Sequence, residues 1–283
     1  MRKLEAPTFE LKLLSSLAKV FADEEPKYQT ECLVMTSLKN ETISFQAAIK
    51  NVGFMKQNLT LKVISPIENM IHARSVEYVP VGRSDCGILD DNYLKTGSGM
   101  YPDLLRELKD NTVVAYPNKW RSVWFDVIVS EDAAAGTYPI ELQFINSENE
   151  VVCSASTKVT IIDAVLPEQD LIHTEWFHAD CLADYYHVDA FSEEHWQIIE
   201  NFLAEYVSRG CNMLLTPMFT PPLDIAVGGE RTTVQLVQIT VENGEYHFNF
   251  DRLKRWVDLG QKYGIKYFEM SHLFSQWGAN YAP

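Results

Sequence analysis

The chain has 283 residues and 46% of them are hydrophobic, which is enough for one large domain or two domains of ordinary size. Its 24 Lys and Arg against 39 Asp and Glu give a formal net charge of −15, which argues against nucleic acid or an anionic membrane surface as the main partner. This charge fits a neutral or small ligand better. The sequence contains no run of about 18 apolar residues that could span a bilayer.

The N-terminus and the cysteines predict a cytoplasmic location. Arg2 and Lys3 begin the chain as they would in a secretion signal, but Glu5, Glu10 and Lys12 interrupt any apolar stretch after them. The cysteines are odd in number and scattered, without a CxxC pair, which predicts free thiols in a reducing compartment rather than disulfides or a zinc site. They are Cys32, Cys86, Cys153, Cys181 and Cys211.

Residues 1–165 are predicted to form an antiparallel β-sandwich. Short runs rich in β-branched and aromatic residues alternate with a period of two and are separated by turn formers. These expected strands are residues 42–50, 59–64, 122–129, 137–144 and 157–162. In the third of them Val123, Phe125, Val127 and Val129 share one face, as in a strand that covers a core.

Residues 82–119 are expected to be a long insert between these strands. Its Asp85, Asp90, Asp91 and Asn92 offer oxygen ligands for calcium, but they lack the spacing of an EF-hand. A solvated acidic loop is therefore the favoured interpretation.

After Pro167 the hydrophobic period changes to that of an α/β unit. We expect strands at 171–177, 211–218 and 265–270, a helix at 193–209 capped by Ser192, and a second helix that Asp251 caps and Gly264 ends. Asn243-Gly244 predicts a hairpin between residues 233–241 and 245–250. Residues 166–283 thus predict a parallel sheet that opens a (β/α)8 TIM barrel, apparently truncated, since such a barrel has eight strands.

Each expected parallel strand ends in polar and aromatic residues, which in a barrel would meet at one rim. Aromatic rings beside short hydrogen-bonding side chains are typical of neutral carbohydrate sites. Taken singly, Trp176 and Trp277 fit core packing as well as sugar stacking, and His272 fits a structural role as well as a site. His173 and His178 lie on opposite sides of a strand and cannot chelate one ion without a bend, so no metal is expected.

Other polar residues near these ends have more than one interpretation. His178 and Asp180 are expected to form a hydrogen-bonded pair, and Arg231 either makes an ordinary salt bridge or reaches into the pocket. No pair of acidic residues stands out as a general acid and base, although Glu175 and Glu269 lie on expected strands.

Several motifs in order resemble the start of the catalytic barrel of glycoside hydrolase family 123 and its uncharacterised relatives. They are TEWFHADCLADYY from Thr174, TPMFTPPLD, GGERTTVQLV, FDRLKRWVDLGQKYGI and YFEMSHLFSQWGA, and upstream WFDVIV and AGTYPIEL resemble the family's N-terminal β-sandwich. The resemblance implies a β-N-acetylgalactosaminidase in which the sugar's own acetamido oxygen attacks the anomeric carbon, with an Asp-Glu pair on a later strand that has no counterpart here. It implies these sugar contacts: Trp176, His178, Asp180, Tyr186, His272, Gln276 and Trp277.

The sequence therefore predicts a glycosidase-type protein acting on a neutral or N-acetylated glycan. We expect no cofactor or metal, a carbohydrate substrate as the partner, no nucleic-acid or membrane partner, and leave self-association open. The catalytic residues are expected beyond this chain, which by itself would then be inactive. The alternative is a non-catalytic carbohydrate-binding or assembly protein in which the sandwich is the working part.

Overall fold

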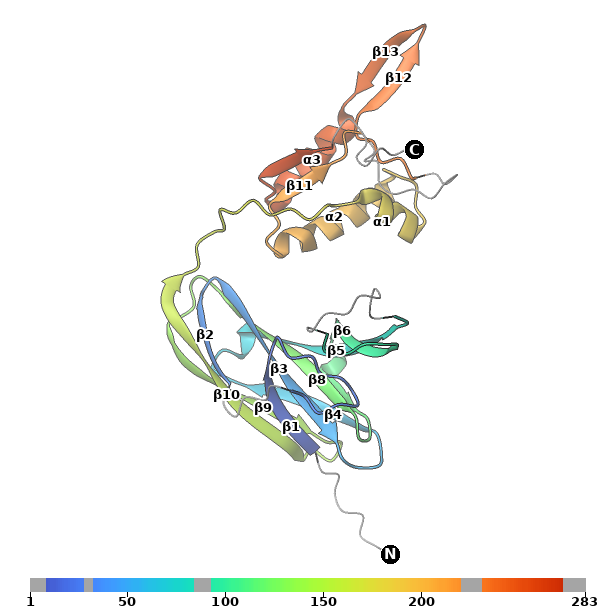
Figure 1. The fold of residues 1–283 in the computed structure, drawn as a ribbon. Helices are drawn as coiled ribbons and strands as arrows, with labels where there is room; N and C mark the ends of the chain where they lie inside the picture. Colours follow the sequence, from blue (N-terminus) through green and yellow to red (C-terminus); the bar gives the residue numbers. More distant parts are fainter. Residues whose placement is uncertain (1–8, 28–32, 84–92, 220–230, 272–283) are drawn as a thin grey trace, which may run out of the picture. The chain divides into compact units, whose positions relative to one another are not determined.

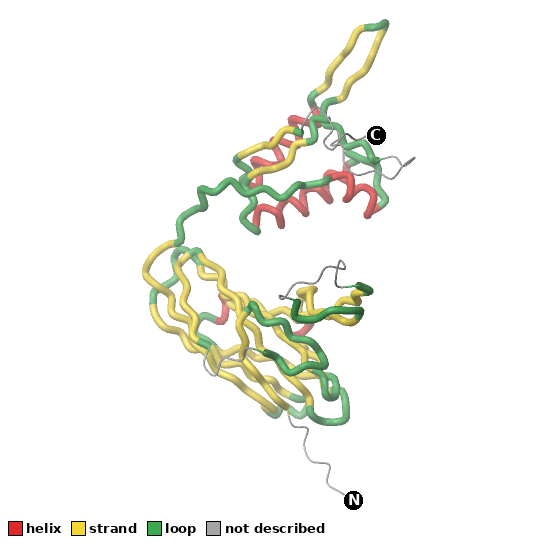
Figure 2. Tube along the Cα trace, in the orientation of Figure 1, coloured by secondary structure: helices red, strands yellow, loops and turns green. Residues whose placement is uncertain are grey.

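The computed structural model describes residues 9–27, 33–83, 93–219 and 231–271. The chain divides into two compact units, Met1–Pro167 and Glu168–Pro283. Strands dominate the first unit, and the α-helices of the described residues all belong to the second (Figures 1 and 2). No helix among the described residues is long and apolar enough to cross a membrane.

The first unit consists of two five-stranded sheets. One sheet has the order β1 (Phe9–Ser15), β3 (Glu41–Asn51), β8 (Trp120–Val129), β5 (Ile71–Val81) and β6 (Gly99–Glu107). The other has the order β2 (Val34–Lys39), β10 (Val151–Val165), β9 (Gly136–Ile145), β4 (Gln57–Ile64) and β7 (Thr112–Ala115). Neighbouring strands pair antiparallel except β2 with β10, which is a parallel pair.

Alternating side chains of both sheets form the core of this unit. Val123, Phe125, Val127 and Val129 are all buried in one cluster, which confirms the face predicted from their spacing. Phe45 lies opposite Phe125 in the ladder, and their rings stack with centroids 4.8 Å apart and planes 12° apart. Burial on this scale is the main source of stability in a sandwich.

The expectation of a long loop at 82–119 is wrong for most of its described part. β6 and β7 lie in this stretch, joined by a short 3-10 helix, η2 (Lys109–Asn111). Pro102 interrupts the hydrophobic alternation of β6, yet it sits opposite Tyr78 where the register shifts, on the edge strand of its sheet. Edges and bulges are where a strand accommodates proline. Asp85, Asp90, Asp91 and Asn92 lie outside the described residues.

The second unit combines helices with a short parallel pair of strands. Its elements are α1 (Ala179–Tyr186), α2 (Glu193–Ser208), β11 (Met213–Thr216), β12 (Gln238–Glu242), β13 (Glu245–Asn249), α3 (Asp251–Tyr263) and β14 (Tyr267–Met270). β11 and β14 pair in parallel, from Met213 opposite Tyr267 to Thr216 opposite Met270. Trp196 and Trp256, from α2 and α3, meet at 6.3 Å in the core of this unit.

Several local predictions for this unit are confirmed. The Ser192 hydroxyl accepts a hydrogen bond from the backbone N–H of His195 and so caps α2. Asn243 and Gly244 have φ of 51° and 85°, the positive values that a tight hairpin turn requires. Gly264 ends α3 in the left-handed region, with φ of 101°.

Two local expectations are wrong, and one helix was not predicted. Residues 171–177 are not a strand, although the His173 carbonyl accepts bonds from the backbone N–H groups of Asn212 and Met213. Residues 179–186 form the helix α1, which is too short for a clear helical period. Asp251 does not cap α3, because Phe250 occupies the cap position and the Asn249 side chain accepts from the Asp251 N–H.

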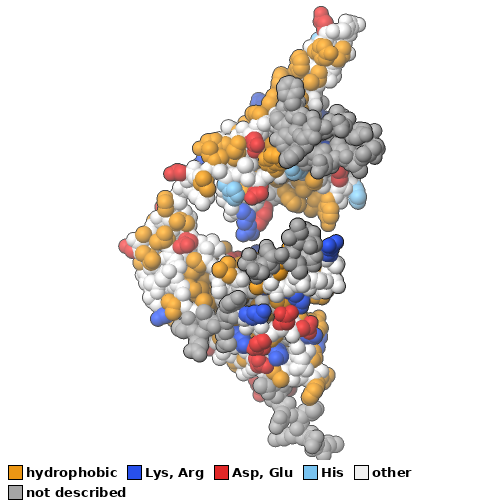
Figure 3. All heavy atoms as spheres, in the orientation of Figure 1, with side chains coloured by type: hydrophobic (Ala, Val, Ile, Leu, Met, Phe, Trp, Pro, Cys, Tyr) orange, Lys and Arg blue, Asp and Glu red, His pale blue; other side chains and the backbone are white. Residues whose placement is uncertain are grey.

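The β12–β13 hairpin projects from its unit with one apolar face (Figures 1 and 3). Ile239 lies opposite Phe248 and Val241 opposite Tyr246, so the four side chains share a face. They are 41–68% exposed.

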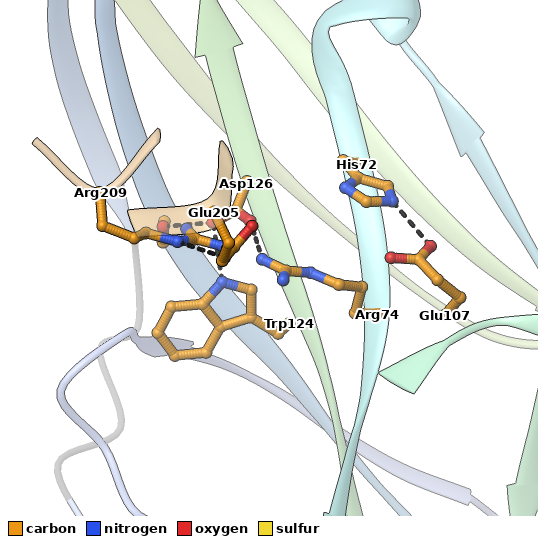
Figure 4. A network of polar contacts seen from close by, with 8 residues as sticks. His72, Arg74, Glu107, Trp124, Asp126, Glu205 and Arg209 are labelled. Atoms are coloured by element: carbon orange, nitrogen blue, oxygen red, sulfur yellow. Dashed lines mark hydrogen bonds and ion pairs between the residues drawn. The ribbon is translucent and has the colours of Figure 1, made fainter. Parts of the chain in front are cut away.

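The outer face of the first sheet of the sandwich carries a polar network (Figure 4). The Asp126 Oδ1 atom accepts from the Ser44 hydroxyl at 2.6 Å and from the Trp124 indole N–H at 2.8 Å, while Oδ2 pairs with Arg74. Burial alone would raise the pKa of Asp126, but these hydrogen bonds and the Arg74 charge together lower it. The carboxylate thus holds the indole ring and the guanidinium in fixed positions.

Candidate functional site

The ends of β11 and β14 are joined by backbone and hydroxyl contacts. The Ser271 N–H donates to the Thr216 carbonyl at 3.1 Å, and the Ser271 hydroxyl contacts both the N–H and the carbonyl of Phe219 at 3.2 Å. Thr216 and Ser271 are both buried. The contacts of Ser271 therefore hold the backbone together at the carboxyl ends of the two strands. Nearby on β14, the Glu269 Oε2 atom is buried with no hydrogen-bond partner among the described residues.

Trp176 and His178 lie together just before α1. Their rings meet edge to face with centroids 6.1 Å apart, and the Trp176 side chain is 48% exposed. Burial lowers the pKa of His178, an effect that the Asp180 charge partly opposes and the Arg231 charge reinforces. At neutral pH the imidazole is therefore uncharged and offers one hydrogen-bond donor and one acceptor.

Asp180 and Arg231 form a buried ion pair across the site. Arg231 Nη2 lies 2.7 Å from Asp180 Oδ2, and each side chain is only 7% exposed. Among the described residues, Asp180 Oδ1 and Arg231 Nε have no hydrogen-bond partner. A buried polar atom without a partner costs about 1–3 kcal/mol, so stability alone does not explain this arrangement.

The segment that carries Arg231 links α1 to the end of β11. Thr232 donates from its hydroxyl to the Asp184 carboxylate on α1. A few residues later, the N–H of Leu236 donates to the Pro217 carbonyl at 2.9 Å and that of Val237 to the Met218 carbonyl at 3.3 Å. Residues 231–237 therefore bring the Asp180–Arg231 pair toward the polar end of β11.

The structure brings Trp176, His178 and Asp180 together and places Tyr186 elsewhere. Tyr186 lies at the other end of α1, where its ring contacts Tyr185 at 5.1 Å and Phe202 at 6.2 Å. His272, Gln276 and Trp277 lie outside the described residues.

The prediction of a hydrogen bond between His178 and Asp180 is wrong. Asp180 Oδ2 pairs with Arg231, and Oδ1 has no hydrogen-bond partner in the described part of the chain. The sequence predicted either a salt bridge or a place in the pocket for Arg231, and the salt bridge is confirmed. Its partner, Asp180, lies too far away in the sequence to be predicted from local pattern.

His173 contacts Glu175 and Cys211. Its Nε2 lies 3.6 Å from Glu175 Oε1, and its Nδ1 lies 3.8 Å from the Cys211 sulfur. Across the described ranges, no group of three or more His, Cys, Asp or Glu side chains could hold a metal ion. Cys153, Cys181 and Cys211 are free thiols, and burial raises the pKa of each.

Comparison with protein families gives one match, the glycoside hydrolase 123 catalytic domain, over residues 176–283. Residues 176–283 are therefore similar to the catalytic domain of glycoside hydrolase family 123. The resemblance stated from the sequence motifs is thereby confirmed, and Trp176, His178, Asp180 and Arg231 all lie within the family 123 segment.

One solved structure is similar in fold to most of this chain. A family 123 glycoside hydrolase from Clostridium perfringens, studied for the details of glycolipid glycan hydrolysis, matches with a TM-score of 0.69 at 15% identity. That match covers 92% of this chain, which spans only 46% of the Clostridium structure.

Other solved structures are much less similar. A β-glucosidase from Listeria innocua has a TM-score of 0.26 at 12% identity, over 56% of this chain and 17% of its own. The N-terminal domain of PorA has a TM-score of 0.28 at 8% identity, over 55% of this chain and 99% of its own. No curated protein sequence matches this chain.

Proposed function

We propose that this chain is part of a glycoside hydrolase that acts on a neutral or N-acetylated glycan. The observation that carries the proposal is the family 123 catalytic-domain match at residues 176–283, inside which Trp176, His178 and Asp180 come together. An exposed indole, an uncharged imidazole and a carboxylate are the groups that stack on a sugar ring and bind its hydroxyls.

The proposal includes a (β/α)8 barrel as the scaffold of the site. β11 and β14 are parallel strands, with the β12–β13 hairpin and then α3 between them in the chain, and the Clostridium match supports this proposal for the fold. In such a barrel the active site lies at the carboxyl ends of the strands. Thr216, Ser271 and the segment after β11 occupy those ends here.

We propose a β-N-acetylhexosaminide as the substrate. In the mechanism implied by family resemblance, the acetamido oxygen of the sugar is the nucleophile, an Asp orients it and a Glu is the general acid and base. We assign neither role to a described residue: Glu175 is largely exposed beside His173, and Asp180 is paired with Arg231. The described residues would hold and orient the sugar.

Binding and hydrolysis by the full chain test this proposal. We expect N-acetylgalactosamine to change the tryptophan fluorescence of the protein, and Trp176→Ala to weaken the binding about 2- to 10-fold by removing a stacking surface. Tyr246→Ala, which removes an exposed ring of the β12–β13 hairpin, is the matched control and should leave the affinity unchanged. A protein that neither binds this sugar nor hydrolyses any aryl N-acetyl-β-hexosaminide would contradict the proposal.

A second candidate function is carbohydrate binding by the sandwich. One observation favours it: a cavity of about 190 Å³ on the first sheet is lined by Trp124, Gln46 and Val76, with Pro102 and Leu105 of β6 along it. Asp126 holds the indole of Trp124 in place. Loss of N-acetylgalactosamine binding in Trp124→Ala, with Trp176→Ala unaffected, would favour this candidate over the first.

A further inference from the structure

The β12–β13 hairpin has one polar and one apolar face. The apolar face consists of Ile239 and Val241 on β12 and of Tyr246 and Phe248 on β13, which lie opposite each other in the ladder. Polar residues alternate with these four and point to the other side, because successive side chains of a strand point to opposite faces. This alternation is the pattern of a strand pair that buries one face and leaves the other in water.

No described element of the chain pairs with this hairpin. Among the described strands, β12 and β13 form a sheet only with each other, and the hairpin extends away from the helices of its own unit (Figure 1). Its four apolar side chains are 41–68% exposed. A two-stranded hairpin is only marginally stable in water by itself, and a contiguous exposed apolar face marks an interaction surface.

The area of the apolar face fits a second copy of this chain. An aromatic side chain offers about 150–250 Å² of surface, so the exposed parts of the four side chains amount to roughly 400 Å². Phe250, at the base of the hairpin, is itself 53% exposed and adds to this surface. Two copies that face each other therefore approach the roughly 1,000 Å² that a specific interface buries in total, which fits a reversible dimer.

The charges at the two ends of the hairpin determine how two copies can face each other. The tip carries Glu242 and Glu245, which lie opposite each other. The base leads into the first turn of α3, where Arg252 and Lys254 outnumber Asp251. Two tips placed side by side would bring four carboxylates together, whereas in an antiparallel arrangement each acidic tip lies against the more basic end of the other copy.

We propose that the apolar face of the β12–β13 hairpin is the interface of a homodimer, in which two hairpins pack face to face and antiparallel about a two-fold axis. A contact of this symmetry uses the same surface on both copies, so one apolar face is sufficient. Packed sheets lie about 10 Å apart, which leaves room for the side chains of the two copies to interdigitate. The inference is independent of the proposed function, because it concerns self-association and not the binding of a sugar.

Sedimentation velocity of the full chain over a range of concentrations tests this interface. The wild-type protein should form a dimer that dissociates on dilution. Val241→Lys places a charge on the apolar face of both copies and should weaken the dimer at least about 100-fold, because the interface would bury that charge without a partner. Thr240→Lys is the matched control, since the same charge one residue earlier points to the polar face, and this variant should remain dimeric.

Charge reversal tests the orientation of the two hairpins. Lys254→Glu should weaken the dimer about 2- to 10-fold, because it places an acidic side chain where the acidic tip of the other copy lies. Adding Glu242→Lys to this variant should restore the affinity, since tip and base then carry opposite charges again. A double variant that dimerises no better than Lys254→Glu alone would overturn the antiparallel arrangement.

Hydrogen exchange of the wild-type protein gives a readout that needs no substitution. The amides of β12 and β13 should exchange more slowly as the protein concentration rises, whereas those of α2 should not change. A protein that is monomeric at every concentration, or a dimer that Val241→Lys and Thr240→Lys affect equally, would overturn the inference. A monomer whose hairpin amides are already protected would also overturn it, because another segment of the same chain would then cover the apolar face.

Discussion

Removal of one member of the Asp180–Arg231 pair should destabilise the second unit far more than removal of both. Arg231→Met leaves the Asp180 carboxylate in a place where its side chain is only 7% exposed, with no opposite charge at 2.7 Å. Breaking a buried pair in this way typically costs about 3–5 kcal/mol. The double change Asp180→Leu with Arg231→Met fills the same space with apolar atoms and should stay within about 1 kcal/mol of the wild-type protein.

Tryptophan fluorescence can follow the unfolding of the second unit when Trp120 and Trp124 of the sandwich are first replaced by Phe. Trp196 and Trp256 are buried in the core of the second unit and then dominate the signal. A loss of about 3–5 kcal/mol should lower its thermal midpoint by at least about 10 °C. Arg255→Met breaks the exposed pair with Glu193 and is the matched control, and it should leave the thermal midpoint almost unchanged because solvent screens the two charges.

Two results would refute this reasoning. One is a cost for Arg231→Met as small as that of Arg255→Met, which would mean that water reaches the Asp180 carboxylate. The other is a double variant as unstable as the single one, which would mean that the pair is held for stability. A stable double variant that no longer binds N-acetylgalactosamine would instead place the pair in recognition.

Three further predictions concern the scaffold. Phe125→Ala removes a fully buried ring that stacks on Phe45, and should cost the sandwich about 3–5 kcal/mol in urea unfolding; a cost below about 1 kcal/mol would contradict the packing described. Ser192→Ala removes the cap of α2 and should lower the free energy of unfolding of the second unit by about 1 kcal/mol, measured by thermal unfolding. Ser192→Asp supplies another capping side chain and should keep the wild-type stability. The lowered pKa of Asp126 means that its folded form binds a proton less readily than the unfolded chain, so this group stabilises the sandwich above its ordinary pKa of 3.8 and the contribution disappears as the pH falls through the lower folded value. Asp126→Asn should flatten that part of the stability profile between about pH 5 and pH 2, and an unchanged acid limb would contradict the assignment.

The sequence by itself determined the features that depend on neighbouring residues. The alternation of Val123 and Phe125 predicted a buried strand face, because side chains of a strand point alternately to its two sides. Ser192 and Asn243-Gly244 predicted a helix start and a hairpin turn, because each supplies a local hydrogen bond or a backbone angle that few residues allow. The family 123 motifs likewise lie in short continuous runs.

Only the tertiary structure decided which distant segments meet. The edge strand β6 depends on pairing with β5, and nothing in its own proline-containing sequence predicts a strand. Residues 171–177 form no ladder, because a strand needs a partner and a sequence pattern does not supply one. The same holds for the site: Trp176 and His178 could be chosen from one stretch of sequence, but the partner of Asp180 is Arg231, which only the folding of the chain brings to it.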